Sequence, residues 1–412
     1  MASVTGTHVF RGRRLILGAA IVAALGFVAL GLGLAVDPAR TLRSYLMAFA
    51  FVFTVSVGGL ILLMAGYATN ARWMSVVRRA TEAVVLPLPA LAVLFVPIVF
   101  GAAWLYPWQS PPAGLSSHAL EILQHRGAYL NLPFFTVRAA IYFLVLIIAA
   151  FLLRRWSVRR DARPAELPPG ADEPAAEAAL ARDRTLASAM LPPVGLAFTF
   201  AGIDWILSLE PVWYSSMFGF YLFAGGFLAA IAVVTILTAR IWTREDGSGV
   251  VTPHHFHALG RLLLAFVVFW AYIAFFQALL IRIANKPNEV TYYLQRIAGG
   301  WAVFVYVLIF GHFVVPFLVL LRRPVKFRPR VMAAVGAWLV VMHLVDIYWL
   351  VIPSPMPTPA GSGMLSWLDL AALAAVVGTA VAVAAWRQDG IAVIARGDPF
   401  LARGAVYRST QL

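Results

Sequence analysis

The sequence predicts an all-α polytopic membrane protein with about ten transmembrane helices, and three observations support this prediction. Hydrophobic residues make up 62% of the chain and charged residues only 12%, with a mean hydropathy of +0.84. The apolar residues gather in about ten runs of roughly 20 residues, the length that crosses a bilayer as a helix. Lys and Arg lie mainly in the short segments between these runs. Soluble globular proteins are much less apolar.

In chain order, we expect membrane helices at residues 15–36, 45–68, 83–106, 134–153, 186–208, 218–239, 259–283, 300–321, 331–352 and 364–386. The first apolar run is too long for a secretory signal, and no small-residue cleavage site follows it before Asp37. We therefore expect it to remain as a membrane helix.

The distribution of basic residues predicts the orientation of these helices. Both termini and the loops after the even-numbered helices carry most of the Lys and Arg, including the arginine-rich segments 154–160 and 322–330. Because cytoplasmic loops collect these residues, both termini are expected in the cytoplasm of a bacterial inner membrane. We interpret the two segments as anchors to anionic headgroups. The net charge of +14 is therefore no sign of nucleic-acid binding, and no nucleic acid is expected as a partner.

Two polar interruptions recur within the apolar runs. Asp204 and Asp346 each stand seven residues before a proline, Pro211 and Pro353, with a tryptophan close by in each case. A carboxylate inside the bilayer costs roughly 2.5 to 3.5 kcal/mol unless it is paired, wetted or neutral. Two equivalent carboxylates therefore indicate a structural or functional role.

The spacing of these aspartates predicts an internal repeat. They belong to the fifth and ninth helices, so helices two to five and six to nine form matching sets in a parallel repeat. We expect a tail and first helix at 1–44, one four-helix bundle at 45–208 with a cytoplasmic connector at 154–185, a second bundle at 209–352, and the last helix and tail at 353–412. The Pro, Ala and acid-rich residues 163–184 are expected to be a mobile connector.

Five motifs resemble a known family. They are YLMAFAFVFTVSVGGLILLM from Tyr45, RRATEAVVLPLPALAVLFVPIVFG with LYPW, YLNLPFFTVRAAIYF from Tyr129, FAGIDWILSLEPVWYSSMFGFY, and the helix of Asp346. Together they resemble the NrfD and polysulfide-reductase membrane subunits, and among them the ActF subunit of bacterial alternative complex III. The resemblance runs from about residue 45 to 353.

This resemblance implies a subunit of a respiratory or photosynthetic complex that oxidises quinol and reduces a cytochrome c or another high-potential acceptor. It implies partner subunits that carry haem c and iron-sulfur clusters, a homologous membrane subunit, and surrounding lipids. Quinone or menaquinol is the only cofactor expected near this chain. The chain has no cysteine, so it can hold no covalently attached haem and no cysteine-ligated cluster of its own. This agrees with the assignment of those groups to partner subunits.

Four side chains are candidates for handling protons: Arg138, Asp204, His343 and Asp346. Arg138 lies about one turn inside the fourth predicted helix, where either aspartate could neutralise it. His343 lies three residues before Asp346, on the same helix face, and a histidine with a carboxylate can exchange protons near neutral pH. The alternative is that these groups only join helices through buried pairs and hydrogen bonds.

Five residues near the predicted outer face are candidates for contacting quinone: Tyr142, Trp205, Gln277, Tyr348 and Trp349. A quinone pocket needs an apolar, aromatic slot with one or two hydrogen-bonding groups. Aromatic residues at a membrane boundary also serve as anchors, so a scaffold role remains open.

Three further alternatives remain. His312 and His343 could ligate a b-type haem, although the family that the chain resembles has none in this subunit. His254, His255 and His257 have no carboxylate or cysteine beside them, so we expect a surface cluster at a helix start and not a metal site. A parallel repeat with intramembrane charges is also typical of a secondary transporter. Transporters usually have helices broken by Gly or Pro at matching positions of the two repeats. Pro87, Pro89 and Pro97 interrupt the third predicted helix, but the matching seventh helix has no internal proline.

Overall fold

The computed structural model describes residues 9–112, 115–162, 173–210, 213–242, 249–353 and 364–409. Within these ranges the chain is helical and forms no strand, which confirms the predicted all-α fold. The α-helices are α1 (Arg13–Val36), α2 (Pro38–Ala68), α3 (Met74–Val85), α4 (Leu88–Leu94), α5 (Val96–Phe100), α6 (Ala102–Leu105), α7 (Ser117–Arg126), α8 (Leu132–Asp161), α9 (Glu173–Trp205), α10 (Phe218–Trp242), α11 (Pro253–Ala284), α12 (Pro287–Ile297), α13 (Trp301–Val307), α14 (Val315–Leu321), α15 (Pro329–Val351), α16 (Trp367–Gln388) and α17 (Leu401–Ala405). Short 3-10 turns lie at Leu207–Leu209 and Arg323–Phe327, and a π-helical segment spans Leu308–Val314.

Ten stretches of the described chain are long and apolar enough to cross a membrane. They are α1, α2, α3 to α5, α8, α9 with its 3-10 turn, α10, α11, α13 to α14, α15 and α16. These are the ten predicted runs, with shifted ends. The chain is therefore a multi-pass membrane protein.

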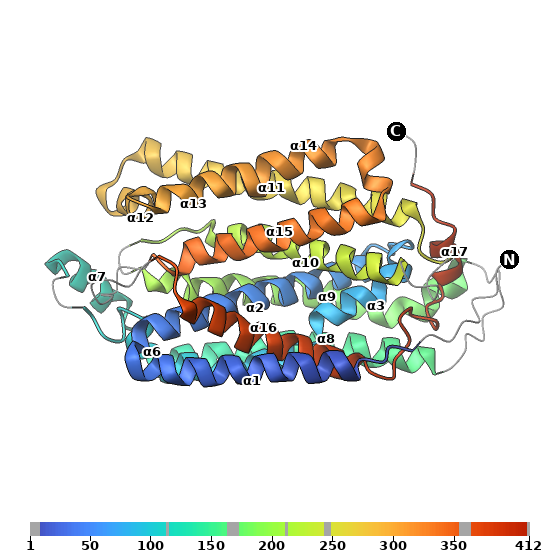
Figure 1. Cartoon of the computed structure of the whole chain (residues 1–412), viewed down its shortest axis with the longest axis horizontal. Coiled ribbons are helices and arrows are strands. Elements are labelled where there is room, and N and C mark those ends of the chain that lie inside the picture. The colour runs from blue at the N-terminus through green and yellow to red at the C-terminus, as the bar shows by residue number, and fades with distance from the viewer. Residues whose placement is uncertain are drawn as a thin grey trace.

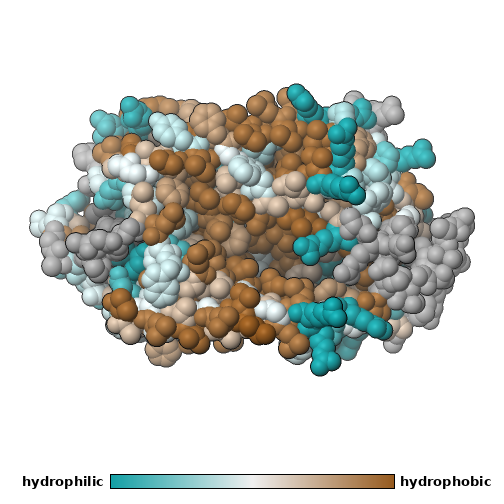
Figure 2. All heavy atoms as spheres, viewed as in Figure 1, coloured by the Kyte–Doolittle hydropathy of each residue, from teal (hydrophilic) through white to brown (hydrophobic). Residues whose placement is uncertain are grey.

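The long helices run along the longest axis of the molecule, while α7 and α12 lie at the end opposite to both termini (Figure 1). Hydrophobic residues cover the middle of the molecule, and most hydrophilic residues in this view lie toward its two ends (Figure 2). An apolar belt of this kind is what the hydrocarbon of a bilayer requires.

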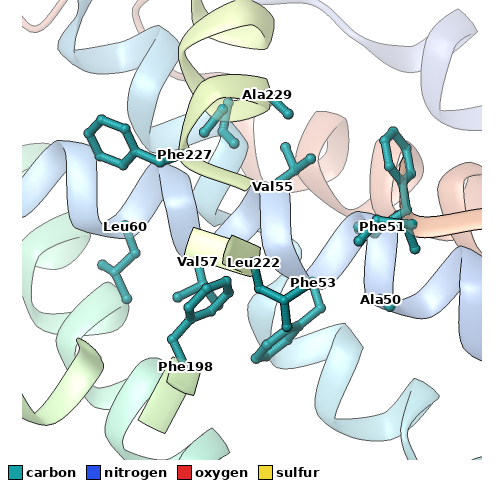
Figure 3. Close-up of a cluster of buried hydrophobic side chains, with 14 of the residues drawn as sticks. Ala50, Phe51, Phe53, Val55, Val57, Leu60, Phe198, Leu222, Phe227 and Ala229 are labelled. Carbon is teal, nitrogen blue, oxygen red and sulfur yellow. The ribbon is translucent and has the colours of Figure 1, made fainter. Parts of the chain in front are cut away.

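Helix α2 forms the centre of the core. Of the 18 residues in its most apolar stretch, 83% are buried. The corresponding share for α1, which packs mainly on α16, is 17%. Phe53 and Val57 of α2 meet Phe198 of α9 and Leu222 of α10 in one apolar cluster (Figure 3). Glycine permits the close crossing of α2 and α10, because a Cβ atom at Gly226 would lie 2.7 Å from the backbone oxygen of Thr54.

The helix contacts agree in part with the predicted repeat. Helix α2 packs on α9, its counterpart α10 packs on α15, and α2 and α10 pack on each other. The third membrane-spanning stretch, however, is divided into α3, α4 and α5, whereas its predicted counterpart α11 is continuous. The arrangement as two equivalent bundles stays a prediction.

The segment 154–185 differs from the prediction of a loop. Residues 154–161 continue α8, and residues 173–185 already belong to α9, while 163–172 lie outside the described residues. Alanine and glutamate favour helix in the second part. In the first part, two arginines find buried carboxylates, Arg154 at Glu82 and Arg160 at Asp183, so these two side chains are not headgroup anchors.

The C-terminal segment 389–409 folds back over the ends of the long helices. Asp398 forms an ion pair with Arg78 of α3. The backbone oxygen of Gly404 lies 2.9 Å from Nε2 of His255 at the start of α11, and the amide of Gly397 donates to Asp161 of α8 at 2.8 Å. This C-terminal segment therefore joins three membrane helices.

Candidate functional site

Asp204 and Arg138 form a buried ion pair between α9 and α8. Nε and Nη2 of Arg138 donate to the two carboxylate oxygens of Asp204 at 2.8 and 3.1 Å. The hydroxyl of Tyr142 donates to the same carboxylate at 2.8 Å, and Asp204 is 0% exposed. Of the two aspartates that could neutralise Arg138, Asp204 is thus the partner.

The rest of the Arg138 guanidinium is held by the segment before α8. Nη1 donates to the backbone oxygen of Tyr129 at 2.7 Å, and the guanidinium carbon lies 3.8 Å from the centre of the Tyr129 ring. Burial, followed by the nearby negative charge of Asp204, raises the pKa of Tyr129 to about 12. Both charged groups of the pair are fully engaged in hydrogen bonds, a geometry that suits a structural contact between two helices.

Asp346 of α15 has a different environment. The hydroxyl of Tyr221 in α10 donates to Oδ1, and Nε1 of Trp270 in α11 donates to Oδ2 at 3.0 Å. Asp346 is only 1% exposed. Both partners are neutral groups, so Asp346 joins α10, α11 and α15 without an ion pair.

This difference separates Asp346 from the other buried carboxyl groups in the described ranges. The others pair with arginine: Glu82 with Arg79 and Arg154, Asp183 with Arg160, Asp204 with Arg138, Glu210 with Arg296, Asp369 with Arg40, and Asp398 with Arg78. A proton can therefore bind or leave Asp346 without stranding a buried cation. At each of the other sites, protonation would leave an arginine without its counter-charge.

His343 lies beside Asp346 but forms no hydrogen bond with it. Its Nε2 lies 2.9 Å from the hydroxyl of Thr54, and its Nδ1 has no partner among the described residues. Both side chains surround Gly225 of α10, where a Cβ atom would lie 3.0 Å from Nδ1 of His343 and 3.4 Å from Oδ2 of Asp346. His343 and Asp346 are thus neighbours, as the sequence predicts, but no hydrogen bond joins them in the described structure.

His312 completes this group, which we call the Asp346 cluster: Thr54, Tyr221, Trp270, His312, His343 and Asp346. The π-helical segment carries His312, whose ring centre lies 4.1 Å from that of Trp270. His312 is 0% exposed, and neither of its ring nitrogens has a partner among the described residues. π-Helical turns inside α-helices are frequent at functional sites because they place a side chain outside the normal helical register.

Two of the five candidates for quinone contact, Tyr142 and Trp205, are neighbours, with ring centres 6.2 Å apart. Tyr142 is bound to Asp204, while the hydroxyl of Tyr348 lies 3.2 Å from Asp369 and Nε1 of Trp349 donates to the backbone oxygen of Arg296. Trp205 alone lines an apolar hollow between α2, α9 and α10, and its Nε1 has no partner among the described residues. Gln277 is buried on α11, and its Oε1 is likewise without a described partner. Quinone contact by these five residues stays a prediction.

Sequence reasoning missed two buried ion pairs that tie predicted loop ends to the bundle. Arg40 donates to Asp369 at 2.8 Å, and Ser44 adds a second bond to that carboxylate, which joins α2 to α16. Arg296 donates to Glu210 at 2.7 Å next to the end of α15. The available signal was a charged residue within one turn of a predicted helix end.

The histidine cluster is not the expected surface feature. His255 is 0% exposed and His257 is 6% exposed, because the C-terminal segment and Phe327 cover them. Nδ1 of His255 also accepts a hydrogen bond from the backbone N–H of Thr252 at 2.9 Å and so caps the first turn of α11. Among the described residues, no group of three or more His, Asp and Glu could hold a metal ion.

No family model matches the sequence, and no curated protein matches it. Membership of the ActF and NrfD family therefore stays a prediction from the five motifs.

Proposed function

We propose that this chain is an integral membrane subunit of a quinol-oxidising electron-transfer complex, and that Asp346 carries a proton within it. The five motifs and the cysteine-free sequence support the assignment to such a complex. Partner subunits would then hold the haem and iron-sulfur groups.

One observation carries the role of Asp346: it is a buried carboxyl group held only by neutral donors. Quinol oxidation releases protons, and a group that takes up a proton inside the membrane must tolerate both of its charge states. The Tyr221 hydroxyl and the Trp270 N–H stabilise the anion, while burial favours the neutral acid. His343 beside this carboxyl group, and His312 against Trp270, add imidazole nitrogens without partners among the described residues.

Asp204 is held by a cation, Arg138, and we therefore give it a different role from that of Asp346. Loss of its negative charge would leave Arg138 buried with no counter-ion, at a cost of several kcal/mol. Asp204 and Arg138 therefore hold α8 against α9. Because Tyr142 and Tyr348 already bind buried carboxylates and Trp349 binds a backbone oxygen, we assign quinol oxidation itself to a partner subunit.

The test is quinol oxidation by the purified complex with Asp346→Asn, with Glu121→Gln, at an exposed carboxylate, as the matched loss of charge that should leave turnover unchanged. We expect the Asn variant to assemble, as judged on a native gel, and to lose most of its turnover because Asn cannot ionise. Wild-type turnover with an unchanged pH profile would leave this chain as a scaffold.

A secondary transporter of a small solute is the second candidate. The division of the third membrane stretch into α3, α4 and α5 and the π-helical turn in the eighth favour it, because transporters use interrupted helices. The uninterrupted α11 in the matching position speaks against it. Co-purification decides: haem c and iron-sulfur signals that accompany the tagged chain support the complex, whereas a solitary monodisperse protein supports the transporter.

A further inference from the structure

A shallow crevice opens between α3 and α4, α8 and α16, toward the end of the bundle where the termini lie. Its walls are mainly apolar side chains, chiefly Leu86, Pro89, Ile147 and Phe151, and the ion pair of Glu82 and Arg154 lines it as well. Arg387 from α16 closes it on one side. The crevice thus combines an apolar floor with a cation.

The charge around this crevice is positive. Among the described residues, Arg387 has only one hydrogen bond, from Nη1 to the backbone oxygen of Leu86 at 3.3 Å, and no carboxylate lies against it. The exposed Arg155 lies over the Phe151 ring, 5.7 Å from its centre. The buried Glu82 beneath is already shared by Arg79 and Arg154. The two outer guanidinium groups are therefore available to an anion.

Two exposed aromatic residues place the crevice at the depth of lipid headgroups. Trp386, next to Arg387, is 67% exposed, and Phe151 on the wall is 47% exposed. Tryptophan at the end of a membrane helix marks the boundary between hydrocarbon and headgroups. Phe151 then faces acyl chains, while both arginines reach the level of phosphate groups.

We propose that this crevice binds one anionic phospholipid, with the phosphate between Arg387 and Arg155 and an acyl chain along Phe151 and Ile147. The apolar floor favours a lipid over a free phosphate ion, because an ion would gain nothing from it. The uncompensated arginines favour an anionic headgroup over a zwitterionic one, whose ammonium group would lie among like charges.

The experiment measures lipid retained by the protein after purification in mild detergent, followed by native mass spectrometry with added dioleoylphosphatidylglycerol or dioleoylphosphatidylcholine. Loss of a charge-assisted bond to phosphate corresponds to about a tenfold weaker affinity. We expect this weakening for phosphatidylglycerol in Arg387→Gln, a smaller one in Arg387→Lys, and none in Arg261→Gln, an exposed arginine of α11 outside both arginine-rich segments.

Phe151→Ala provides an independent variant that leaves every arginine in place, and it should also weaken retention if Arg387→Gln fails to fold. Equal retention of the two lipids, or no change in both Arg387→Gln and Phe151→Ala, would overturn the proposal. Displacement of phosphatidylglycerol by millimolar inorganic phosphate would overturn it as well, since it would identify a simple anion site.

Discussion

Arg138 and Asp204 meet through two hydrogen bonds, whereas Asp346, which occupies the equivalent place in the sequence, meets no cation in the described structure. The first aspartate thus holds a fixed charge and the second does not. The following predictions separate the two.

Removing one member of the Arg138 and Asp204 pair should destabilise the protein strongly. Asp204→Asn leaves a buried guanidinium without its counter-charge, at a cost of about 3 to 5 kcal/mol. Arg138→Gln should cost a similar amount, and the double variant much less than the sum of the two. Unfolding titrations in mixed micelles measure all three. Additive losses would show that the pair does not act as a unit.

Asp346→Asn should cost about 1 kcal/mol or less of stability. The amide oxygen can accept from Trp270 and the amide nitrogen can donate to the Tyr221 hydroxyl, so both buried hydrogen bonds survive. The same titration measures this change. A loss as large as that of Asp204→Asn would mean that Asp346 is paired with a cation after all, and would remove the basis of its proposed role.

Gly226→Ala should loosen the crossing of α2 and α10. The new Cβ atom would lie 2.7 Å from the backbone oxygen of Thr54, so the helices must move apart, at a cost of about 1 to 3 kcal/mol. Gly18→Ala on α1 is the control, because a Cβ atom there meets nothing within 4 Å. Thermal unfolding midpoints should fall for the first variant only. Equal midpoints would contradict the close crossing.

Single-cysteine labelling tests the orientation, since the chain has no native cysteine. Ser110→Cys, before α7, should react with an impermeant thiol reagent in intact cells. Arg159→Cys, at the far end of α8, should react only after the cells are opened. The reverse pattern would place both aspartates near the cytoplasm.

Composition and apolar periodicity were sufficient to predict the ten membrane stretches, because each needs only length and hydropathy. The ion pair at Asp204 could be anticipated from the cost of an unpaired intramembrane charge, but the choice between two aspartates could not. That choice depends on which helices pack together. Position in the sequence suggested that Asp204 and Asp346 are equivalent, and their contacts show that they are not.

Other misses have the same origin. The register of Trp270 against His312 depends on the π-helical turn, which leaves no mark in hydropathy. The arginines 154 and 160 looked like headgroup anchors because their carboxylates, Glu82 and Asp183, lie on other helices, α3 and α9. Pairing between distant segments decided each of these cases.

The C-terminal segment also sets an order of events during synthesis. Arg78 belongs to the third stretch to enter the membrane, yet its carboxylate partner, Asp398, is synthesised only after α16. Gly404, which covers His255, follows later still. Until Asp398 has been synthesised, water or lipid phosphate must solvate this guanidinium, so its burial waits for the segment that follows α16. A chain interrupted after α16 would therefore present an open, charged surface to quality-control proteases.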